Sequence, residues 1–379
     1  MKKIVSIVLN NFKNDSRVLK ENISLQNAGY NVQVVALWEE KLKEEVNIQE
    51  ISVHRIKLKS KNWSKNRLVQ LIKYFEFIFK VFKKYKSADI VHCNDLYTLP
   101  IGVIVKLFCN KNVKIVYDAH EYEINDRPNE GKMSIQLKYL LEKALIRYAD
   151  RVITVSNAIA EEYARLYDIP KPALVLNTPP YREIENKDLF RERFGIAGEC
   201  PIFLYQGGLS GGRGIEILLD AFKGLHDEGG DTIPAIVFMG YGPLKEEIEE
   251  ISKEYENIHF HPAVSPDVLL EYTGSADFGI SLIEDVCLSY RYSLPNKMFE
   301  YLMADLPVIV SDLPEMRQII EENKVGVVAR ANSSVGLKEA IEEAMRLDRE
   351  VLQKNIQEVK KIYNWEAQEK VLLGVYEGL

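Results

Sequence analysis

The chain has few cysteines and no long hydrophobic run. Its four cysteines are scattered over 379 residues and form no CxxC pair: Cys93, Cys109, Cys200 and Cys287. This distribution argues against a disulfide framework or a zinc site and favours a reducing compartment. The first apolar run, Ile4 to Leu9, ends at Asn10-Asn11 and is too short for a signal peptide or a membrane span. We therefore expect a buried strand there and a cytoplasmic protein.

The chain also lacks a strong excess of one charge. A net charge of −7 gives no basis for a general polyanion-binding surface, so we expect no nucleic-acid partner. Hydrophobic residues make up 46% of the sequence, which is enough to bury two cores. Because 379 residues are too many for one ordinary core, two domains are expected.

Short β-branched runs alternate with helical patterns from end to end. Such alternation predicts parallel sheets that helices cover on both faces. Expected strands in the first half are 3–9, 31–37, 89–93, 113–117, 151–155 and 173–176, with helices at 16–28, 67–86, 97–108, 133–148 and 158–167. Expected strands in the second half are 202–205, 235–239, 258–260, 277–282, 307–310 and 326–328.

The alternation pauses at 177–187, where Pro179-Pro180 and a run of charges replace periodic structure. We interpret this segment as an interdomain linker, with an N-terminal domain at 1–182 and a second domain at 183–362. The predicted fold is α/β, with two tandem doubly wound Rossmann-like domains facing a cleft. Ligands of such sheets bind beyond the carboxyl ends of the strands.

The segment Ser293–Glu300 is the first candidate site. Pro295 suits the first turn of a helix, where free N–H groups and the helix dipole favour a phosphate. Helical spacing places Asn296, Lys297 and Glu300 on one face, where they could hold a diphosphate and the ribose hydroxyls. The alternative is a capped helix with a surface Lys–Glu pair, which the spacing alone favours.

Two glycine turns follow predicted strands in the same half. The run 205–214 contains Gly208 and Arg213, and glycine allows close backbone approach while arginine offers a planar fork to phosphate. The turn 240–243 contains Tyr241 and precedes a helix. The alternative for both is an ordinary strand-to-helix turn that binds nothing, and it accounts for most of the turn 240–243, where Pro243 suits the first position of a helix.

In the first half, candidate polar residues follow the ends of predicted strands. His120 could hydrogen-bond a sugar hydroxyl or move a proton, or it could be a structural histidine. Asp95 occupies a similar strand end, and Asp15 and Arg17 begin the first helix. His259 and His261 alternate on a strand with no third ligand nearby, so no metal site is expected.

A basic, aromatic stretch covers 57–86. It holds ten Lys or Arg residues against one acid, Glu76. An apolar stripe runs along the predicted helix: Leu68, Leu71, Ile72, Phe75, Phe79 and Phe82. Further apolar residues widen this surface beyond what docking on a sheet needs: Tyr74, Phe77, Ile78 and Val81. The pattern fits an amphipathic segment lying on an anionic membrane, or an ordinary crossover helix with a basic edge.

Taken together, the turns resemble the family 4 retaining glycosyltransferases of the GT-B fold. The resemblance runs from "NDSRVLKENISLQNAGYNVQVV" through "YDAHE" and "YQGGLSGGRGIEILLDAF" to "SLPNKMFEYLMADLPVIVSD". It implies that the second domain binds a nucleotide sugar, with UDP the expected nucleotide, and that the first binds a glycan or lipid-linked glycan. It also implies that a last helix, 363–379, returns to the first domain. The reaction implied is retaining transfer without a metal or other cofactor, in bacterial surface polysaccharide biosynthesis.

The resemblance also assigns roles to residues. Arg213 and Lys297 would contact the diphosphate, Glu300 the ribose and His120 the transferred sugar. Gly208, Tyr241, Val264, Leu294, Pro295 and Asn296 would line the donor site, while Asp15, Arg17 and Asp95 would lie on the acceptor side.

Two departures from the family pattern concern the donor site. Tyr292 stands where a glutamate is usual, and Gly207-Gly208 stands where Gly-Arg is usual. Glu284 or Asp285 could substitute for the missing carboxylate. Two alternatives stay open. One is a sugar-nucleotide epimerase-like enzyme on the same fold, and the other is a non-catalytic sugar-nucleotide-binding partner protein, which the absence of the glutamate at position 292 keeps open.

Overall fold

The computed structural model describes residues 1–185, 187–230 and 232–379, and it contains two compact units. Unit 1 comprises Met1–Asp126, Glu130–Val175 and Glu369–Leu379, and unit 2 comprises Arg127–Asn129 and Leu176–Gln368. The chain therefore passes between the units at Val175 and again within its last helix, α15 (Trp365–Tyr376). The predicted linker contains Asn186, which lies outside the described residues.

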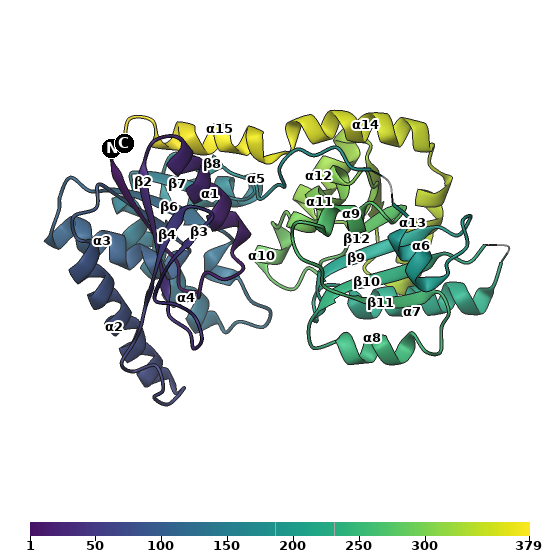
Figure 1. Cartoon of the computed structure of the whole chain (residues 1–379), viewed down its shortest axis with the longest axis horizontal. Coiled ribbons are helices and arrows are strands. Elements are labelled where there is room, and N and C mark those ends of the chain that lie inside the picture. Colours follow the sequence, from purple (N-terminus) through teal and green to yellow (C-terminus); the bar gives the residue numbers. More distant parts are fainter. Residues whose placement is uncertain (186, 231) are drawn as a thin grey trace. The chain divides into compact units, whose positions relative to one another are not determined.

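Unit 1 is built on an eight-stranded sheet with the order β3-β4-β2-β1-β5-β6-β7-β8 (Figure 1). All neighbouring strands are parallel except β3 and β4. The strands are β1 (Lys3–Ile7), β2 (Asn31–Leu37), β3 (Glu45–Ile48), β4 (Ile51–Ile56), β5 (Ile90–Asn94), β6 (Lys114–Ala119), β7 (Arg151–Thr154) and β8 (Ala173–Leu174). The helices are α1 (Ser16–Asn27), α2 (Arg67–Tyr85), α3 (Leu99–Phe108), α4 (Lys132–Leu145) and α5 (Asn157–Tyr167), with short 3-10 turns η1 (Leu96–Thr98), η2 (Glu123–Asn125) and η3 (Ile146–Tyr148).

The hairpin of β3 and β4 was not predicted. Its two-residue connection, Gln49-Glu50, has φ values of 46° and 69°. Two positive φ values define the hairpin turn that Asn-Gly usually supplies. Because Gln and Glu carry no such signal, the sequence pattern gave no indication of the turn.

Unit 2 is built on a six-stranded parallel sheet with the order β11-β10-β9-β12-β13-β14 (Figure 1). The strands are β9 (Ile202–Gly208), β10 (Ala235–Tyr241), β11 (Ile258–Pro262), β12 (Phe278–Ser281), β13 (Val308–Ser311) and β14 (Gly326–Ala329). The helices are α6 (Leu189–Phe194), α7 (Ile215–Glu228), α8 (Lys245–Ile251), α9 (Leu269–Thr273), α10 (Leu288–Arg291), α11 (Asn296–Met303), α12 (Pro314–Asn323), α13 (Ser334–Arg346) and α14 (Arg349–Ile362). These two sheets confirm the prediction of two Rossmann-like domains.

Successive residues of β9 enter different cores. Ile202 and Leu204 pack with α11, whereas Phe203 and Tyr205 pack with α7. Since both faces of the strand are buried, its sequence is a continuous apolar run rather than an alternating one. This pattern is what made the strands of both units recognisable.

The sequence left open which apolar face of α2 packs on the sheet. Phe77, Ile78, Val81 and Tyr85 are its buried residues. Most of the apolar stripe named from the sequence is 47–74% exposed: Leu68, Leu71, Ile72, Phe75 and Phe79. The periodicity gave two apolar faces, and the sequence alone did not show which one the sheet covers.

The end of α15 belongs to unit 1, as the resemblance implied. Tyr376 packs edge-on against Tyr30 at 5.7 Å between ring centroids and stacks on His92 at 6.1 Å. Both contacts are buried beside α1 and β5. Within the described ranges, no helix combines the length and apolar character that crossing a membrane requires.

Substituting Gly279→Ala tests how closely α11 packs on β12. A Cβ there would lie 2.2 Å from Cγ of Tyr301, so we expect overpacking to lower the free energy of unfolding by about 1–3 kcal/mol. Urea denaturation measures this loss. Gly374→Ala is the control, because its Cβ would meet no atom within 4 Å and should add about 0.5–1 kcal/mol to the stability of α15. Equal stability of the two variants would contradict the packing described.

Candidate functional site

The sheet of unit 2 has its topological switch point between β9 and β12, where ligands of parallel sheets bind. The loops that follow these two strands meet there. Gly214 N donates to Glu284 Oε1 at 3.3 Å, and Glu284 N donates to Gly212 O at 3.1 Å. The carboxylate of Glu284 is thus used to hold the glycine turn.

Close packing requires glycine at several of these positions. A Cβ at Gly240 would lie 1.9 Å from Gly207 O, and one at Gly242 would lie 2.2 Å from Leu209 O. Close packing of an ordinary strand-to-helix turn therefore explains the glycines of the turn 240–243 without a ligand. At Gly208, by contrast, a Cβ would meet no atom within 4 Å, so nothing in the fold demands glycine there. Gly208 leaves open space at the switch point.

Helix α11 begins beside this turn. Pro295 is its N-cap in an extended conformation, φ −71° and ψ 138°, so the predicted place of Pro295 in the first helical turn is wrong by one residue. Asn296 is exposed at the first helical position, and Leu294 packs partly buried on the core. The first N–H groups of a helix have no acceptor within it, and they point toward the positive end of the dipole.

Lys297 is partly accessible as a residue, but its amine is buried. Among the described residues, Nζ has no hydrogen-bond partner, and it lies 3.7 Å from the centroid of the Tyr205 ring. Burial and the charge of Arg213 lower the pKa of Lys297 to about 7, against the opposing effect of Glu300. A buried amine without an acceptor is costly. An anion bound beside it would remove that cost.

Arg213 and Glu300 complete the polar surroundings of Lys297. The guanidinium of Arg213 lies 4.8 Å from the centroid of the Tyr290 ring. Glu300 Oε2 accepts a hydrogen bond from Gln206 Nε2 at 2.6 Å. Gln206 is fixed in turn, since its N donates to Tyr301 OH at 2.8 Å.

Gln206 was not singled out from the sequence. It lies on β9 directly before the glycine turn, and its Oε1 accepts from Thr273 Oγ1 at 2.7 Å. A buried amide at a strand end beside a glycine turn is the signal that could have identified it.

Two other predicted donor residues lie at or after strand ends, Tyr241 as the last residue of β10 and Val264 after β11. The side chain of Tyr241 is 70% exposed, and Val264 packs partly buried against the core. Asp285 pairs with Arg291 at 2.8 Å beside Tyr292. Both carboxylates considered as substitutes for the usual glutamate, those of Glu284 and Asp285, therefore already have partners within the fold.

His259 and His261 lie in an aromatic cluster. The ring of His259 stacks on Phe194 at 4.6 Å, and His261 lies 4.9 Å from the ring of Tyr272. Burial lowers the pKa of both histidines, that of His259 to about 4. Their surroundings explain them as neutral packing groups.

Unit 1 gathers a second polar cluster at the carboxyl ends of β5 and β6. Arg17 Nη2 lies 3.0 Å from both carboxylate oxygens of Asp118, and its Nη1 donates to Val175 O at 2.7 Å. His120 Nε2 lies 3.3 Å from Asp118 Oδ2, and its Nδ1 lies 3.2 Å from Asp95 Oδ1.

The buried charges of this cluster determine one another's protonation states. Burial alone would raise the pKa of Asp118, but the charges of Arg17 and His120 hold it well below its usual range. Burial raises the pKa of Glu21 to about 8, although Arg17 lies 3.1 Å away and acts to lower it. At neutral pH, Asp118 is therefore the buried anion that lies between the two cations, Arg17 and His120.

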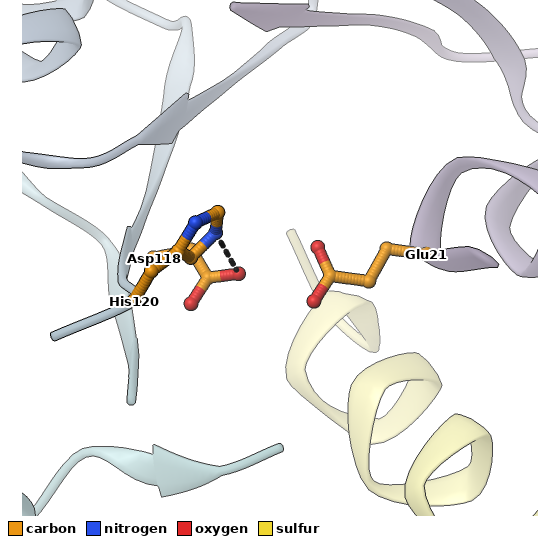
Figure 2. A group of neighbouring side chains, drawn as sticks. All are labelled: Glu21, Asp118 and His120. Carbon is orange, nitrogen blue, oxygen red and sulfur yellow. Dashed lines mark ion pairs between the residues drawn. The ribbon is translucent and has the colours of Figure 1, made fainter. Parts of the chain in front are cut away.

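Glu21, Asp118 and His120 offer three ligand atoms within 4.8 Å of one another (Figure 2). Figure 2 shows Glu21 reaching toward the other two from a separate element, with Asp118 and His120 paired to each other. The guanidinium of Arg17 already occupies both oxygens of Asp118. A metal ion would have to displace this cation, so the cluster fits an ion-pair network better than a metal centre.

The predicted acceptor residues belong to the same region. Asp15 is the N-cap of α1 and accepts from Val18 N at 3.2 Å. Arg17 is only 5% exposed, whereas the side chain of Asp95 is 48% exposed. The structure brings His120, Arg17 and Asp95 together through Asp118, and the roles given to them stay predictions.

Comparisons with known proteins agree with this architecture. Residues 23–178 match the family model Glycosyltransferase Family 4, and residues 200–346 match the model Glycosyl transferases group 1. The chitobiosyldiphosphodolichol beta-mannosyltransferase of Kluyveromyces lactis is 24% identical over 361 residues, which cover 86% of this chain and 78% of that protein. An uncharacterized glycosyltransferase of Methanocaldococcus jannaschii is also 24% identical, covering 76% of this chain and 75% of its own.

Solved structures share the fold over the whole chain. Sucrose-phosphate synthase from Thermosynechococcus elongatus superposes with a TM-score of 0.78 at 18% identity, covering 99% of this chain and 98% of that one. Anabaena HepE, in complex with UDP and glucose, superposes with a TM-score of 0.73 at 15% identity over the full length of both chains. With both halves matched in order, the chain belongs to the family 4 glycosyltransferases of the GT-B fold.

Proposed function

We propose that this glycosyltransferase moves a sugar from a UDP-sugar to a lipid-linked glycan, with retention of configuration and without a metal ion. The observation that carries the proposal is the buried, unpartnered amine of Lys297 near the start of α11, under the influence of Arg213. A diphosphate supplies the missing anion. UDP is the preferred nucleotide because HepE binds UDP and UDP-glucose in the same fold.

The residues of unit 2 would act mainly on the leaving group. Lys297, the guanidinium of Arg213 and the free N–H groups of α11 together supply the positive charge that a departing diphosphate needs. Such charges take the place that a metal ion fills in other transferases. Glu300, oriented by Gln206, would accept hydrogen bonds from the ribose.

The acceptor is inferred from relatives. One relative is named for a mannose transfer to chitobiosyldiphosphodolichol, a lipid-linked glycan. We place the acceptor in unit 1, near His120 and the accessible Asp95. A role in bacterial surface polysaccharide assembly, at the cytoplasmic face of the membrane, is the setting that would supply such an acceptor.

A non-catalytic sugar-nucleotide-binding protein is the second candidate, and Tyr292 is the observation that favours it. An epimerase-like enzyme would also need a donor site but no acceptor. Both alternatives predict nucleotide binding without sugar transfer, so turnover with an acceptor separates them from our proposal.

The peripheral membrane contact rests on the exposed stripe of α2. Five large apolar side chains of this helix face away from the sheet, and Trp63 before it is 55% exposed. The only acid of the stretch, Glu76, is occupied, since it pairs with Lys80 at 2.8 Å and accepts from Lys59 N and Ser60 N. Lys84 pairs with Glu45 at 3.2 Å, and the other lysines of the stretch would meet anionic headgroups.

Helix α4 also exposes an apolar stripe. Its buried residues are charged, Lys138 and Glu142, while Met133, Leu137 and Leu140 are 52–79% exposed at helical spacing. Lys138 pairs with Glu130 at 2.7 Å, and Glu142 accepts from Tyr163 OH at 2.8 Å. Helix α3 contacts both α2 and α4, and we propose that the exposed stripes of these two helices form one surface. An apolar surface with a basic surround fits an anionic bilayer.

The first prediction concerns the donor. UDP should raise the melting temperature more than GDP or ADP, in EDTA as well as in magnesium. Lys297→Met should abolish that shift. It should also stabilise the free protein by about 1–4 kcal/mol, because it removes a buried charge. The gain should be largest below pH 7, where Lys297 is charged, and shrink as the pH rises, because burial has lowered its pKa.

Lys354→Met on α14 is the matched control, because Lys354 is exposed. It should change neither the UDP shift nor the stability. Undiminished UDP binding by the Lys297 variant would show that the diphosphate lies elsewhere, and a strict requirement for magnesium would contradict the metal-free mechanism.

The second prediction concerns stereochemistry. Relatives include one transferase named beta and one named alpha, so the outcome must be measured for this chain. We expect the new glycosidic bond to keep the α configuration of the UDP-sugar, as read from the anomeric proton coupling in the NMR spectrum of the product. A β product would reject retention while leaving the donor site intact.

The third prediction concerns the membrane. The protein should float with vesicles that contain about 30% phosphatidylglycerol, and flotation should weaken at high salt because the lysines are screened. Changing Leu71, Phe75 and Phe79 to serine should abolish flotation. Changing the equally exposed Val335, Val351 and Ile362 of unit 2 to serine should not. Equal flotation of both triple variants would reject α2 as the membrane contact.

A further inference from the structure

Asp95 has an unusual backbone conformation. It follows β5 with φ 65° and ψ 160°, a region that only glycine adopts readily. Hydrogen bonds hold the residue there from both sides. Its N donates to Asp118 O at 2.9 Å, and its O accepts from Thr98 N at 3.1 Å and Thr98 Oγ1 at 3.0 Å. Asp118 and Thr98 are fully buried, so the surroundings determine the strained geometry.

This conformation places a carboxylate against His120. Asp95 Oδ1 lies 3.2 Å from Nδ1 of His120, while the other ring nitrogen faces Asp118 at 3.3 Å. The two carboxylates differ in access, because Asp118 is fully buried and Asp95 is half exposed. Nε2 of His120 is buried, so the accessible side of the ring is the side of Asp95.

We propose that Asp95 is a positioning residue of the transfer reaction: its strained backbone presses a carboxylate against Nδ1 of His120 and fixes the ring where it meets the sugar. This inference rests on the proposed function, which places the acceptor near His120, and on the contact with the transferred sugar that the family resemblance implies for His120. A residue selected for stability at this position would be glycine. An aspartate in this conformation lowers the stability of the fold, and in our proposal this loss is tolerated because the carboxylate orients His120.

The charges around His120 agree with such a role. Four groups face it: Asp95 after β5, Asp118 on β6, and Arg17 and Glu21 on α1. Burial alone would lower the pKa of His120, but Asp95 and Asp118 outweigh burial and Arg17 and raise it to about 9. His120 is therefore a fixed donor at neutral pH rather than a proton acceptor, and its charge disappears as the pH rises through about 9.

Four variants test the proposal: Asp95→Gly, Asp95→Asn, His120→Gln and Lys324→Gly. Turnover is followed as UDP release with a membrane lipid extract as acceptor, using whichever UDP-sugar the wild type consumes fastest. Asp95→Gly should raise the melting temperature by about 1–3 °C because it relieves the strain, yet lower kcat at least tenfold. Lys324→Gly relieves a positive φ of 51° at the end of α12 and should leave kcat unchanged.

Asp95→Asn should lower kcat with little change in KM for the donor. Its activity should also decline at a lower pH than that of the wild type, because His120 has lost one of the two carboxylates that keep it charged. A purely structural residue would not shift the pH profile. If either Asp95 variant keeps kcat within twofold while His120→Gln is inactive, the proposal for Asp95 is wrong and the proposed function stands.

Other outcomes distinguish a failure of the proposal for Asp95 from a failure of the proposed function. Full activity of His120→Gln would overturn the role given to His120, and with it the positioning role of Asp95. A melting temperature of Asp95→Gly well below that of the wild type would show that the aspartate stabilises the fold, which also overturns the proposal. No turnover by the wild type with any UDP-sugar would count against the proposed function itself.

Discussion

Each unit buries a basic side chain near the carboxyl ends of its parallel strands, Arg17 in unit 1 and Lys297 in unit 2. The two differ in whether the fold supplies an acceptor for the buried basic group. Arg17 in unit 1 meets both oxygens of Asp118 and a backbone carbonyl, so the fold itself supplies acceptors for its charge. Lys297 in unit 2 has an aromatic ring beside its amine but no acceptor among the described residues. A buried charge is tolerated when it is paired. Unit 1 thus pairs its buried cation within the fold, and we propose that unit 2 pairs its own with a bound anion.

Burial on both faces explains why most of the fold could be predicted. Central strands such as β9 and β10 are continuous apolar runs, and their limits were recovered to within a few residues. Two features could not be predicted: the type of one tight turn, and the face that one helix turns toward the sheet. The turn at Gln49-Glu50 lacks the residues that normally mark it, and the two apolar faces of α2 could not be ranked without the sheet beneath them.

For the candidate site, the sequence indicated only those residues whose type and position in a motif point to phosphate or ribose binding. Lys297, Glu300 and Arg213 could be named because they flank a glycine turn and a helix start. Gln206, which orients Glu300, is an ordinary strand residue in the sequence. The strain at Asp95 is likewise invisible there, because it results from hydrogen bonds to Asp118 and Thr98 that only the folded sheet brings together.

The division of α15 between the units has a consequence for synthesis of the protein. Unit 1 contains both Met1–Asp126 and Glu369–Leu379, so the first unit to leave the ribosome cannot be finished until residue 379 has followed. Until then, His92 lacks Tyr376, and the polar groups beside α1 lie without one of their covering side chains. The N-terminal unit must therefore wait in an incomplete state while all of unit 2 is translated.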